Sequence, residues 1–274
     1  MINTFDDIEA VRLLVTHYLP TPSLAEIHIV WHNPDKAPPV DLLLRNPDNW
    51  NTTTHRAIPI HVHQQTSNTL NNRWGRPHHD FSTQHVLTID DDTLVEDYAD
   101  VEFAFRIAQQ DTWRLVGMYP RAHTRHANAS LVYMVASEQD KDGFREYSMV
   151  LTKFMFMDAR YFFMYTCLLP DELKQYITKN LNCEDLAMNW MVSGLTGQAP
   201  LAVSPKSRLL DMGTLHGDNL HRISLQDGHL QSRNQCLNAF EAMLGPCPLK
   251  SANYVLEHFI KVPFVKVSKK EHLA

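Results

Sequence analysis

A short hydrophobic segment that runs directly into three aspartates constrains this chain more than any other feature. Val86–Ile89 has the apolar, β-branched composition of a buried strand, and Asp90, Asp91 and Asp92 follow it without a break. In α/β proteins, ligands bind at the carboxyl edge of the sheet, where such a strand would deliver these carboxylates. Adjacent carboxylates repel one another, and a divalent cation removes that cost. The segment therefore predicts an α/β fold with a Mg²⁺ or Mn²⁺ site, because these ions take oxygen ligands.

The same aspartates have two other interpretations. Asp is a preferred residue at a helix N-terminus, so the run could form only a turn and a helix cap. The pattern Asp90-x-Asp92-Thr93 also loosely resembles the nucleophile motif of haloacid-dehalogenase-type phosphohydrolases. That motif usually lies near the start of the chain and has a glycine before its threonine, so it ranks below the metal site. The run alone does not decide between a metal site and a capped turn.

Apolar segments of strand and helix type alternate along the chain, which is typical of an α/β architecture. We predict strands at Glu26–Trp31, Ile58–Val62, Val86–Ile89, Leu115–Tyr119, Leu131–Val135 and Tyr147–Leu151. We predict helices at Ile8–Tyr18, Val101–Ala108, Asp158–Cys167, Glu184–Met191 and His229–Leu244. Gly194 and Gly245 are expected to end the last two helices. The aromatic and Met residues of Phe154–Tyr165 are read as a core helix, and Pro200–Asp227 is left unassigned. No clear linker divides the chain, so residues 1–274 are expected to form one domain.

Composition narrows the class of function. A formal net charge of −6 argues against a basic nucleic-acid-binding surface. The most apolar segment, Phe154–Leu169, is too short to span a bilayer and is interrupted by Asp158 and Arg160. The first residues lack the basic and apolar regions of a signal peptide, so we expect a soluble protein or the catalytic part of a longer, anchored chain. The glycosylation sequons at Asn51 and Asn128 favour a secretory lumen weakly.

A second group of polar residues spans two predicted helices late in the chain. The segment Asn182–Asp185 opens the first helix, where an Asn182 N-cap and acidic first-turn residues are favourable without any function. On the second helix, residues at i, i+4 and i+7 share one side: His229, Arg233 and Cys236. A Cys183–Cys236 disulfide would bring Asp185 within reach of Arg233. This pairing is a hypothesis from spacing. The four cysteines have no Cys-x-x-Cys spacing, so no structural zinc site is predicted from them.

Several ordered stretches together carry a family resemblance. They are Ile29–Asn33, Gln65–Asn68 with Asn72-Arg73, Val86–Leu94, Val116–Arg121, Tyr147–Leu151, Asn182–Asn189 and Arg233–Phe240. Over residues from about Met1 to Ile260, the chain resembles the exostosin-type glycosyltransferases of family 64. The resemblance implies a single GT-A domain, in which a mixed central sheet is flanked by helices. It also implies an Asp-x-Asp metal site and a UDP-sugar donor.

The resemblance assigns roles to individual residues. Asp92 and Asp90 would hold Mn²⁺, or Mg²⁺, against the donor diphosphate, with Asp92 the more direct ligand. Residues that match donor contacts are Asn33, Asn68, Asn72, Arg73, Asp90, Asp91 and His229. Asp185 matches the acidic residue beside the anomeric carbon, and Arg233 matches an active-site contact, so these two would be catalytic. Cys183 and Cys236 match a family disulfide, in agreement with the spacing.

The implied activity is transfer of a sugar from a UDP-sugar, with retention of configuration and dependence on Mn²⁺. The sugar is expected to be an N-acetylhexosamine or a related hexose, and the acceptor a glycan or a glycolipid. Asp185 would stabilise the reacting centre, position the acceptor or act as nucleophile, and the sequence does not choose among these. The resemblance places the protein in the lumen of the Golgi or ER, with no nucleic-acid partner. A homo-oligomer is compatible with the sequence.

Departures from the family pattern make a catalytically impaired, nucleotide-binding or partner-supporting protein the alternative. Only Met1–Phe5 represents the first strand, and Asp7 stands where relatives have an arginine that helps to bind the nucleotide. Lys153 and Phe154 replace small residues, and their bulk is expected to reshape the sugar or acceptor pocket. The tail 262–274 is expected to be flexible.

The sixteen histidines do not by themselves predict a metal site. His61 and His63 share one strand face and His78-His79 lie in a predicted loop, but neither pair has a third ligand in the sequence. Trp74, beside Arg73, would either stack on a base or sugar or pack in the core.

Overall fold

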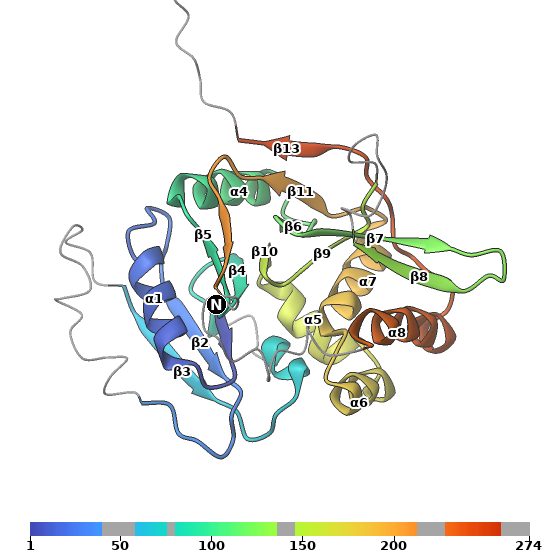
Figure 1. Cartoon of the computed structure of the whole chain (residues 1–274), viewed down its shortest axis with the longest axis horizontal. Coiled ribbons are helices and arrows are strands. Elements are labelled where there is room, and N and C mark those ends of the chain that lie inside the picture. Colours follow the sequence, from blue (N-terminus) through green and yellow to red (C-terminus); the bar gives the residue numbers. More distant parts are fainter. Residues whose placement is uncertain (40–57, 76–79, 136–145, 213–227, 259–274) are drawn as a thin grey trace, which may run out of the picture.

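An eight-stranded sheet forms the centre of the computed structural model, which describes residues 1–39, 58–75, 80–135, 146–212 and 228–258 (Figure 1). Its strands, in spatial order, are β13 (Val255–Glu257), β11 (Leu201–Ser204), β6 (Val116–Gly117), β10 (Phe154–Asp158), β4 (His85–Asp90), β1 (Ile2–Thr4), β2 (Ile27–Trp31) and β3 (Ile60–Gln64). Strand β10 is antiparallel to both neighbours, and every other neighbouring pair is parallel. The predicted α/β class with a mixed central sheet is therefore confirmed. The Asn51 sequon, His78-His79 and the tail 262–274 lie outside the described residues.

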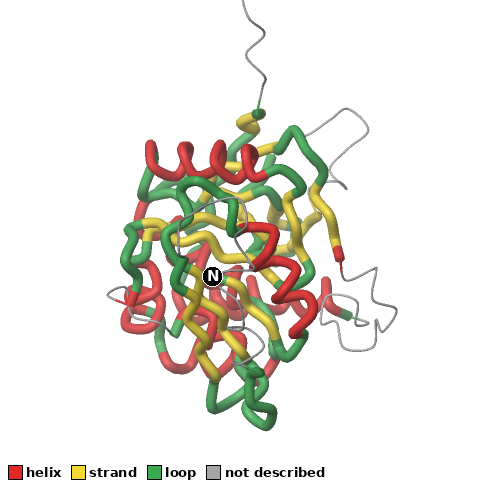
Figure 2. The backbone as a smooth tube through the Cα atoms, turned by 90° about the vertical axis from the view of Figure 1, so that its left-hand side faces the viewer, coloured by secondary structure: helices red, strands yellow, loops and turns green. Residues whose placement is uncertain are grey.

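Helices cover both faces of this sheet (Figures 1 and 2). One core contains residues of α1 (Ile8–Tyr18) and α4 (Tyr98–Gln110). The other contains residues of α5 (Arg160–Leu168), α6 (Asp171–Asn180), α7 (Glu184–Thr196) and α8 (His229–Leu244). Strand β10 separates the two cores, because Phe154 and Phe156 belong to the first and Met155 and Met157 to the second.

Two small sheets extend the ends of the central strands. Strand β5 (Thr93–Val95), directly after the aspartates, pairs with β12 (Leu209–Asp211), and Asp211 is the register partner of Thr93. The second small sheet has the order β8 (Leu131–Val135), β7 (Pro120–Arg125) and β9 (Met149–Val150). A 3₁₀ helix, η1 (Leu70–Trp74), lies between β3 and β4 in the chain.

The predicted bounds agree with the structure for several helices and strands. The bounds of α1, β8 and α8 are those predicted. The core helix predicted from Phe154 is wrong in its first part, because Phe154–Asp158 is the strand β10 and the helix begins at Arg160. All five β10 residues are buried, so no period distinguishes strand from helix there. Gly194 does not end α7, which continues to Thr196 and is capped by Gly197 at φ +67°.

Seven further elements were not predicted. They are η1, β5, β7, α6, β11, β12 and β13. Strands β11 and β12 lie in the segment that the sequence left unassigned. Among the described residues, no helix has the length and apolarity needed to cross a membrane.

Candidate functional site

Arg73 connects the two groups of polar residues that the sequence analysis singled out. From η1, its Nη1 donates a hydrogen bond to Asp90 Oδ1 at 2.6 Å, at the carboxyl end of β4. Its Nε lies 3.4 Å from Oε1 of Glu184, the first residue of α7. Arg73 is buried, and although burial opposes its charge, Asp90 and Glu184 hold its pKa above the usual value. The end of β4 and the start of α7 are therefore parts of one charged cluster.

Arg233 and Asp185 form the second ion pair of this cluster. From α8, Arg233 Nη2 donates to Asp185 Oδ2, and Nη1 donates to Asn182 Oδ1 at 3.2 Å. The Arg233 guanidinium lies 4.7 Å from the ring centroid of Tyr133. Burial opposes the charge of Arg233, but Asp185 and Tyr133 keep its pKa above the usual value. Asp185 and Arg233, predicted to act together, are therefore in direct contact.

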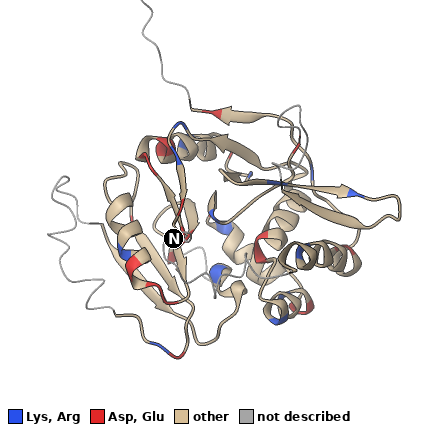
Figure 3. Ribbon diagram, in the orientation of Figure 1, with Lys and Arg blue, Asp and Glu red and all other residues tan. Residues whose placement is uncertain are grey.

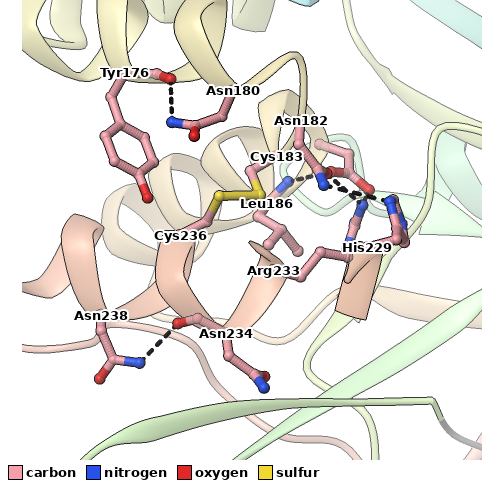
Figure 4. The surroundings of a disulfide bond; sticks show 11 residues. Tyr176, Asn180, Asn182, Cys183, Leu186, His229, Arg233, Asn234, Cys236 and Asn238 are labelled. Carbon is pink, nitrogen blue, oxygen red and sulfur yellow. Dashed lines mark hydrogen bonds and ion pairs between the residues drawn. A yellow bond between two sulfur atoms is a disulfide. The ribbon is translucent and has the colours of Figure 1, made fainter. Parts of the chain in front are cut away.

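A disulfide joins Cys183 and Cys236 beside this pair, as predicted. Figure 4 shows Asn182, His229 and Arg233 converging next to the bridge, and the Asn182 amide lies 3.3 Å from His229 Nδ1. Cys183 has φ 79°, a left-handed conformation that costs a non-glycine residue about 1–2 kcal/mol. The capping role proposed for Asn182 is wrong, because Cys183 occupies the N-cap and no side chain caps α7. Asn182 instead orients Arg233 and His229.

Asp92 contacts a lysine. Lys153 Nζ lies 3.3 Å from Asp92 Oδ2 and 3.2 Å from Asp211 Oδ2. Thr93 Oγ1 donates to the other Asp92 oxygen at 3.0 Å. Of the two bulky residues that depart from the family pattern, only Lys153 reaches the carboxylates. Phe154 is fully buried in the core, so the prediction that it would reshape a pocket is wrong.

The middle aspartate has different surroundings from its neighbours. Burial raises the pKa of Asp91 to about 7, and a hydrogen bond with Thr4 opposes this shift only in part. Asp7 adds to the negative charge around Asp91. The Asp7 carboxylate also accepts a hydrogen bond from Ala10 N at 2.9 Å and so caps α1. Asp7 therefore caps α1 and adds negative charge to this end of the sheet.

Of the asparagines predicted to contact the donor, Asn33 and Asn68 lie in loops near this edge of the sheet and Asn72 lies in η1. Asn33 Oδ1 accepts hydrogen bonds from the backbone N–H groups of Asp35 and Lys36, at 2.9 and 3.2 Å, and holds the turn after β2. Asn72 Nδ2 donates to Ser67 O at 2.6 Å. Asn68 is exposed in the loop before η1. Asn33 Nδ2 also donates to Asp6 Oδ2 at 3.2 Å. The role of these asparagines toward a donor stays a prediction.

Comparison with known proteins decides the family. The sequence profile described as "Glycosyl transferase family 64 domain" matches residues 1–260. The chain belongs to glycosyl transferase family 64. It is 30% identical over 258 residues to exostosin-2 of Homo sapiens, covering 94% of this chain and 33% of that protein. It therefore spans about a third of the exostosin-2 length.

Shorter members of family 64 match over most of their own length. Glycosylinositol phosphorylceramide mannosyl transferase 1 of Arabidopsis thaliana is 30% identical, over 91% of this chain and 72% of the relative. Exostosin-like 2 of Homo sapiens is 28% identical, over 94% and 76% respectively. Among solved structures, GalNAc-T7 with UDP, GalNAc and Mn²⁺ aligns with a TM-score of 0.47 at 11% identity, over 71% of this chain and 40% of that one.

Glu184 and Asp211 belong to the cluster but were not predicted. Glu184 was read as a first-turn residue of its helix, and Asp211 lies in the unassigned segment. Burial, and then the neighbouring Asp185, raise the pKa of Glu184, while Arg73 and Arg233 oppose the shift. Trp74 is fully buried and its Nε1 donates to Glu184 O at 3.3 Å, so it packs in the core rather than stacking on a ligand. The contacts of Arg73 with both Asp90 and Glu184 become visible only in the tertiary structure.

The cluster has more carboxyl groups than basic groups. In Figure 3, acidic and basic residues meet near the centre of the ribbon. The cluster contains six carboxyl groups and three basic groups: Asp90, Asp91, Asp92, Glu184, Asp185 and Asp211, with Arg73, Lys153 and Arg233. The Lys153 ammonium lies 3.3 Å from Asp92 and 3.2 Å from Asp211 and partly neutralises these two carboxylates. The oxygen donors fit Mn²⁺ or Mg²⁺.

Proposed function

We propose that this family 64 member transfers a sugar from a UDP-sugar to a glycan or glycolipid acceptor, with retention of configuration and dependence on Mn²⁺. The observation that supports this most strongly is the position of Arg73, 2.6 Å from Asp90 and 3.4 Å from Glu184. Through it, the carboxylates at the end of β4 and the Asp185–Arg233 pair belong to one cluster. The proposal treats residues 1–274 as one catalytic domain.

In the proposed mechanism, Asp90 and Asp92 would hold the metal, which would supply positive charge to the diphosphate leaving group. Arg73 and Arg233 supply further positive charge that is already fixed before the reaction, which is the efficient form of electrostatic stabilisation. Arg233 orients Asp185 beside the anomeric carbon, where a carboxylate stabilises developing positive charge. The leaving phosphate takes the acceptor proton on the same face of the sugar, which retains the configuration.

The relatives suggest donors to test, and the disulfide suggests the cellular compartment of this reaction. The name of the Arabidopsis relative describes a mannosyl transferase with a glycolipid acceptor, so GDP-mannose belongs among the donors to test beside UDP-sugars. Disulfides form and persist in oxidising compartments. The Cys183–Cys236 bridge therefore favours the lumen of the Golgi or ER as the location.

A catalytically impaired, nucleotide-binding protein is the alternative, and two observations favour it. Lys153 pairs with the predicted metal ligand Asp92 at 3.3 Å. Asp7 adds negative charge where relatives have a positive one. Both changes weaken binding of the metal or of an anionic donor unless a second contact compensates.

The two functions differ in turnover. We would incubate the protein with Mn²⁺ and a panel of UDP-N-acetylhexosamines, UDP-hexoses and GDP-mannose, and measure nucleotide release. The enzyme predicts release that Asp185→Asn abolishes, while Asp171→Asn, at an exposed position on α6, leaves it unchanged. Mn²⁺-dependent nucleotide binding without release from any donor would establish the alternative. Release that survives Asp185→Asn would rule out the proposed catalytic pair.

A further inference from the structure

Away from the carboxylate cluster, three histidines on β2 and β3 lie around the carboxylate of Glu26: His28, His61 and His63. His28 on β2 and His61 on β3 are register partners in this parallel pair, so their side chains lie on the same face. Glu26 immediately precedes β2. One ligand atom each from Glu26, His28 and His61 lie within 4.8 Å of one another. The structure thus adds two ligands to His61, His28 on the neighbouring strand and Glu26 directly before that strand.

His28 is the buried centre of this cluster. Its Nε2 lies 3.3 Å from Glu26 Oε1, yet this buried nitrogen has no partner in hydrogen-bond geometry. Its other nitrogen, Nδ1, lies 2.9 Å from His63 Nε2. When Nδ1 carries the proton and donates to His63, Nε2 presents a lone pair toward the Glu26 carboxylate. That arrangement leaves two electron-rich atoms facing each other across a gap that a cation would fill.

We propose that Glu26, His28 and His61 bind a Zn²⁺ ion, with His63 as the hydrogen-bonding partner that orients His28. Imidazole and carboxylate ligands suit zinc, and tetrahedral Zn–N and Zn–O bonds of about 2.0–2.1 Å place neighbouring ligand atoms roughly 3.3 Å apart. The corresponding separations are 3.3 Å from His28 Nε2 to Glu26 Oε1 and 3.8 Å from His61 Nε2 to Glu26 Oε2. The His61 side chain is 46% exposed, so it can turn inward by the remaining distance.

Two further contacts hold the ligands in place. Ser82 N donates a hydrogen bond to Glu26 Oε1 at 2.7 Å. The contact between His28 Nδ1 and His63 Nε2, at 2.9 Å, is an outer contact of the kind that fixes the tautomer of a ligating histidine.

The zinc site is separate from the carboxylate cluster. Glu26 and His28 lie at the amino end of β2, whereas Asn33 and the end of β4 lie at the carboxyl edge. Glu26 and His28 also line a cavity of about 530 Å³, whose other walls include Phe81, Phe105 and Phe156. This cavity leaves room for a water molecule in the fourth position. The inference stands independently of the proposed glycosyltransferase activity, because imidazole ligands suit zinc whereas all-carboxylate sites suit Mn²⁺ or Mg²⁺.

Zinc titration of the tag-free protein tests the proposal. We expect one Zn²⁺ per chain by isothermal titration and by metal analysis after dialysis, and tetrahedral absorption bands when Co²⁺ replaces it. Two variants each remove one ligand: His61→Ala, at a partly exposed position, and Glu26→Gln, which keeps the acceptor for Ser82. Each should weaken Zn²⁺ binding about 100-fold or more, because losing a ligand costs more than the 10–100-fold effect of losing an outer contact. The matched control is His126→Ala, an exposed histidine in the β7–β8 hairpin. It should bind Zn²⁺ as the wild type does.

The two metal sites are distinguished by Asp92→Asn. This variant should keep the stoichiometric zinc, while His61→Ala keeps nucleotide binding. Circular dichroism checks that each variant is folded, and if His61→Ala unfolds, Glu26→Gln decides the question alone. Absence of stoichiometric zinc in the wild type would overturn the proposal. So would zinc affinity that both ligand variants retain, or that only Asp92→Asn removes.

Discussion

Lys153 Nζ lies 3.3 Å from Asp92 Oδ2, so a side chain of this protein pairs with the residue expected to bind the metal most directly. The ammonium also lies 6.0 Å from the centroid of the Tyr119 ring, and burial, Asp211 and Asp92 raise the pKa of that tyrosine to about 12. Tyr119 therefore stays neutral and does not compete for Lys153. The lysine and the proposed metal ion would therefore compete for the same carboxylate.

Removing this lysine should strengthen metal binding. For Lys153→Ala we expect Mn²⁺ to bind roughly fivefold more tightly, equivalent to about 1 kcal/mol for a partly exposed ion pair. Titration calorimetry measures the change. Lys174→Ala is the control, because Lys174 pairs with the exposed Asp171 on α6. Equal Mn²⁺ affinity in the Lys153 variant and the wild type would show that the lysine moves away from Asp92 without cost.

Loss of Arg73 should damage both the fold and nucleotide binding. Arg73→Met leaves Asp90 and Glu184 without their shared cation, and breaking a buried ion pair on one side costs about 3–5 kcal/mol. Urea unfolding should show this loss, and nucleotide binding should disappear under conditions where the variant is still folded. Arg208→Ala removes an exposed pair with Glu96 and should leave the unfolding midpoint unchanged. A stable Arg73→Met variant that binds nucleotide would remove Arg73 from the site.

The sequence predicts those parts of this site that depend on local pattern. A buried strand followed by carboxylates identified β4 and Asp90–Asp92, and one-sided spacing on a helix identified Arg233. It does not predict that Arg73 links the two groups of carboxylates, because Arg73 and Glu184 are 111 positions apart in the chain. The local pattern explains Glu184 as a favourable acidic residue in the first turn of a helix and gives no sign of this contact. Strand β10 was missed for a related reason. Both of its faces are buried, so apolar residues occupy every position and carry no period.

Acid should destabilise the protein through His32. Burial, and then the nearby Arg73, lower the pKa of His32 to about 3, whereas an unfolded chain titrates near the ordinary 6.5. Because the folded protein holds His32 neutral, this contribution to the free energy of unfolding is fully present above pH 6.5. It is lost as the pH falls from 6.5 toward 3, by up to about 1.4 kcal/mol per pH unit. His32→Gln should lose less stability than the wild type between pH 7 and pH 5. His126→Gln, at an exposed position, should follow the wild-type curve. Parallel acid profiles for His32→Gln and the wild type would contradict this assignment.

Reducing the disulfide should loosen the Asp185–Arg233 pair. The bridge closes a segment with a sequence separation of 53 residues, and the chain-entropy relation gives about 4 kcal/mol of stabilisation for a loop of that size. We expect Cys183→Ser to lower the free energy of unfolding by an amount of this order. We also expect it to reduce donor turnover more than nucleotide binding, because Arg73 and Asp90 lie outside the loop while Asp185 and Arg233 lie within it. Cys167→Ser is the matched control, since Cys167 is a free, exposed cysteine. If Cys183→Ser and Cys167→Ser unfold at the same urea concentration, the bridge does not hold the start of α7 in place.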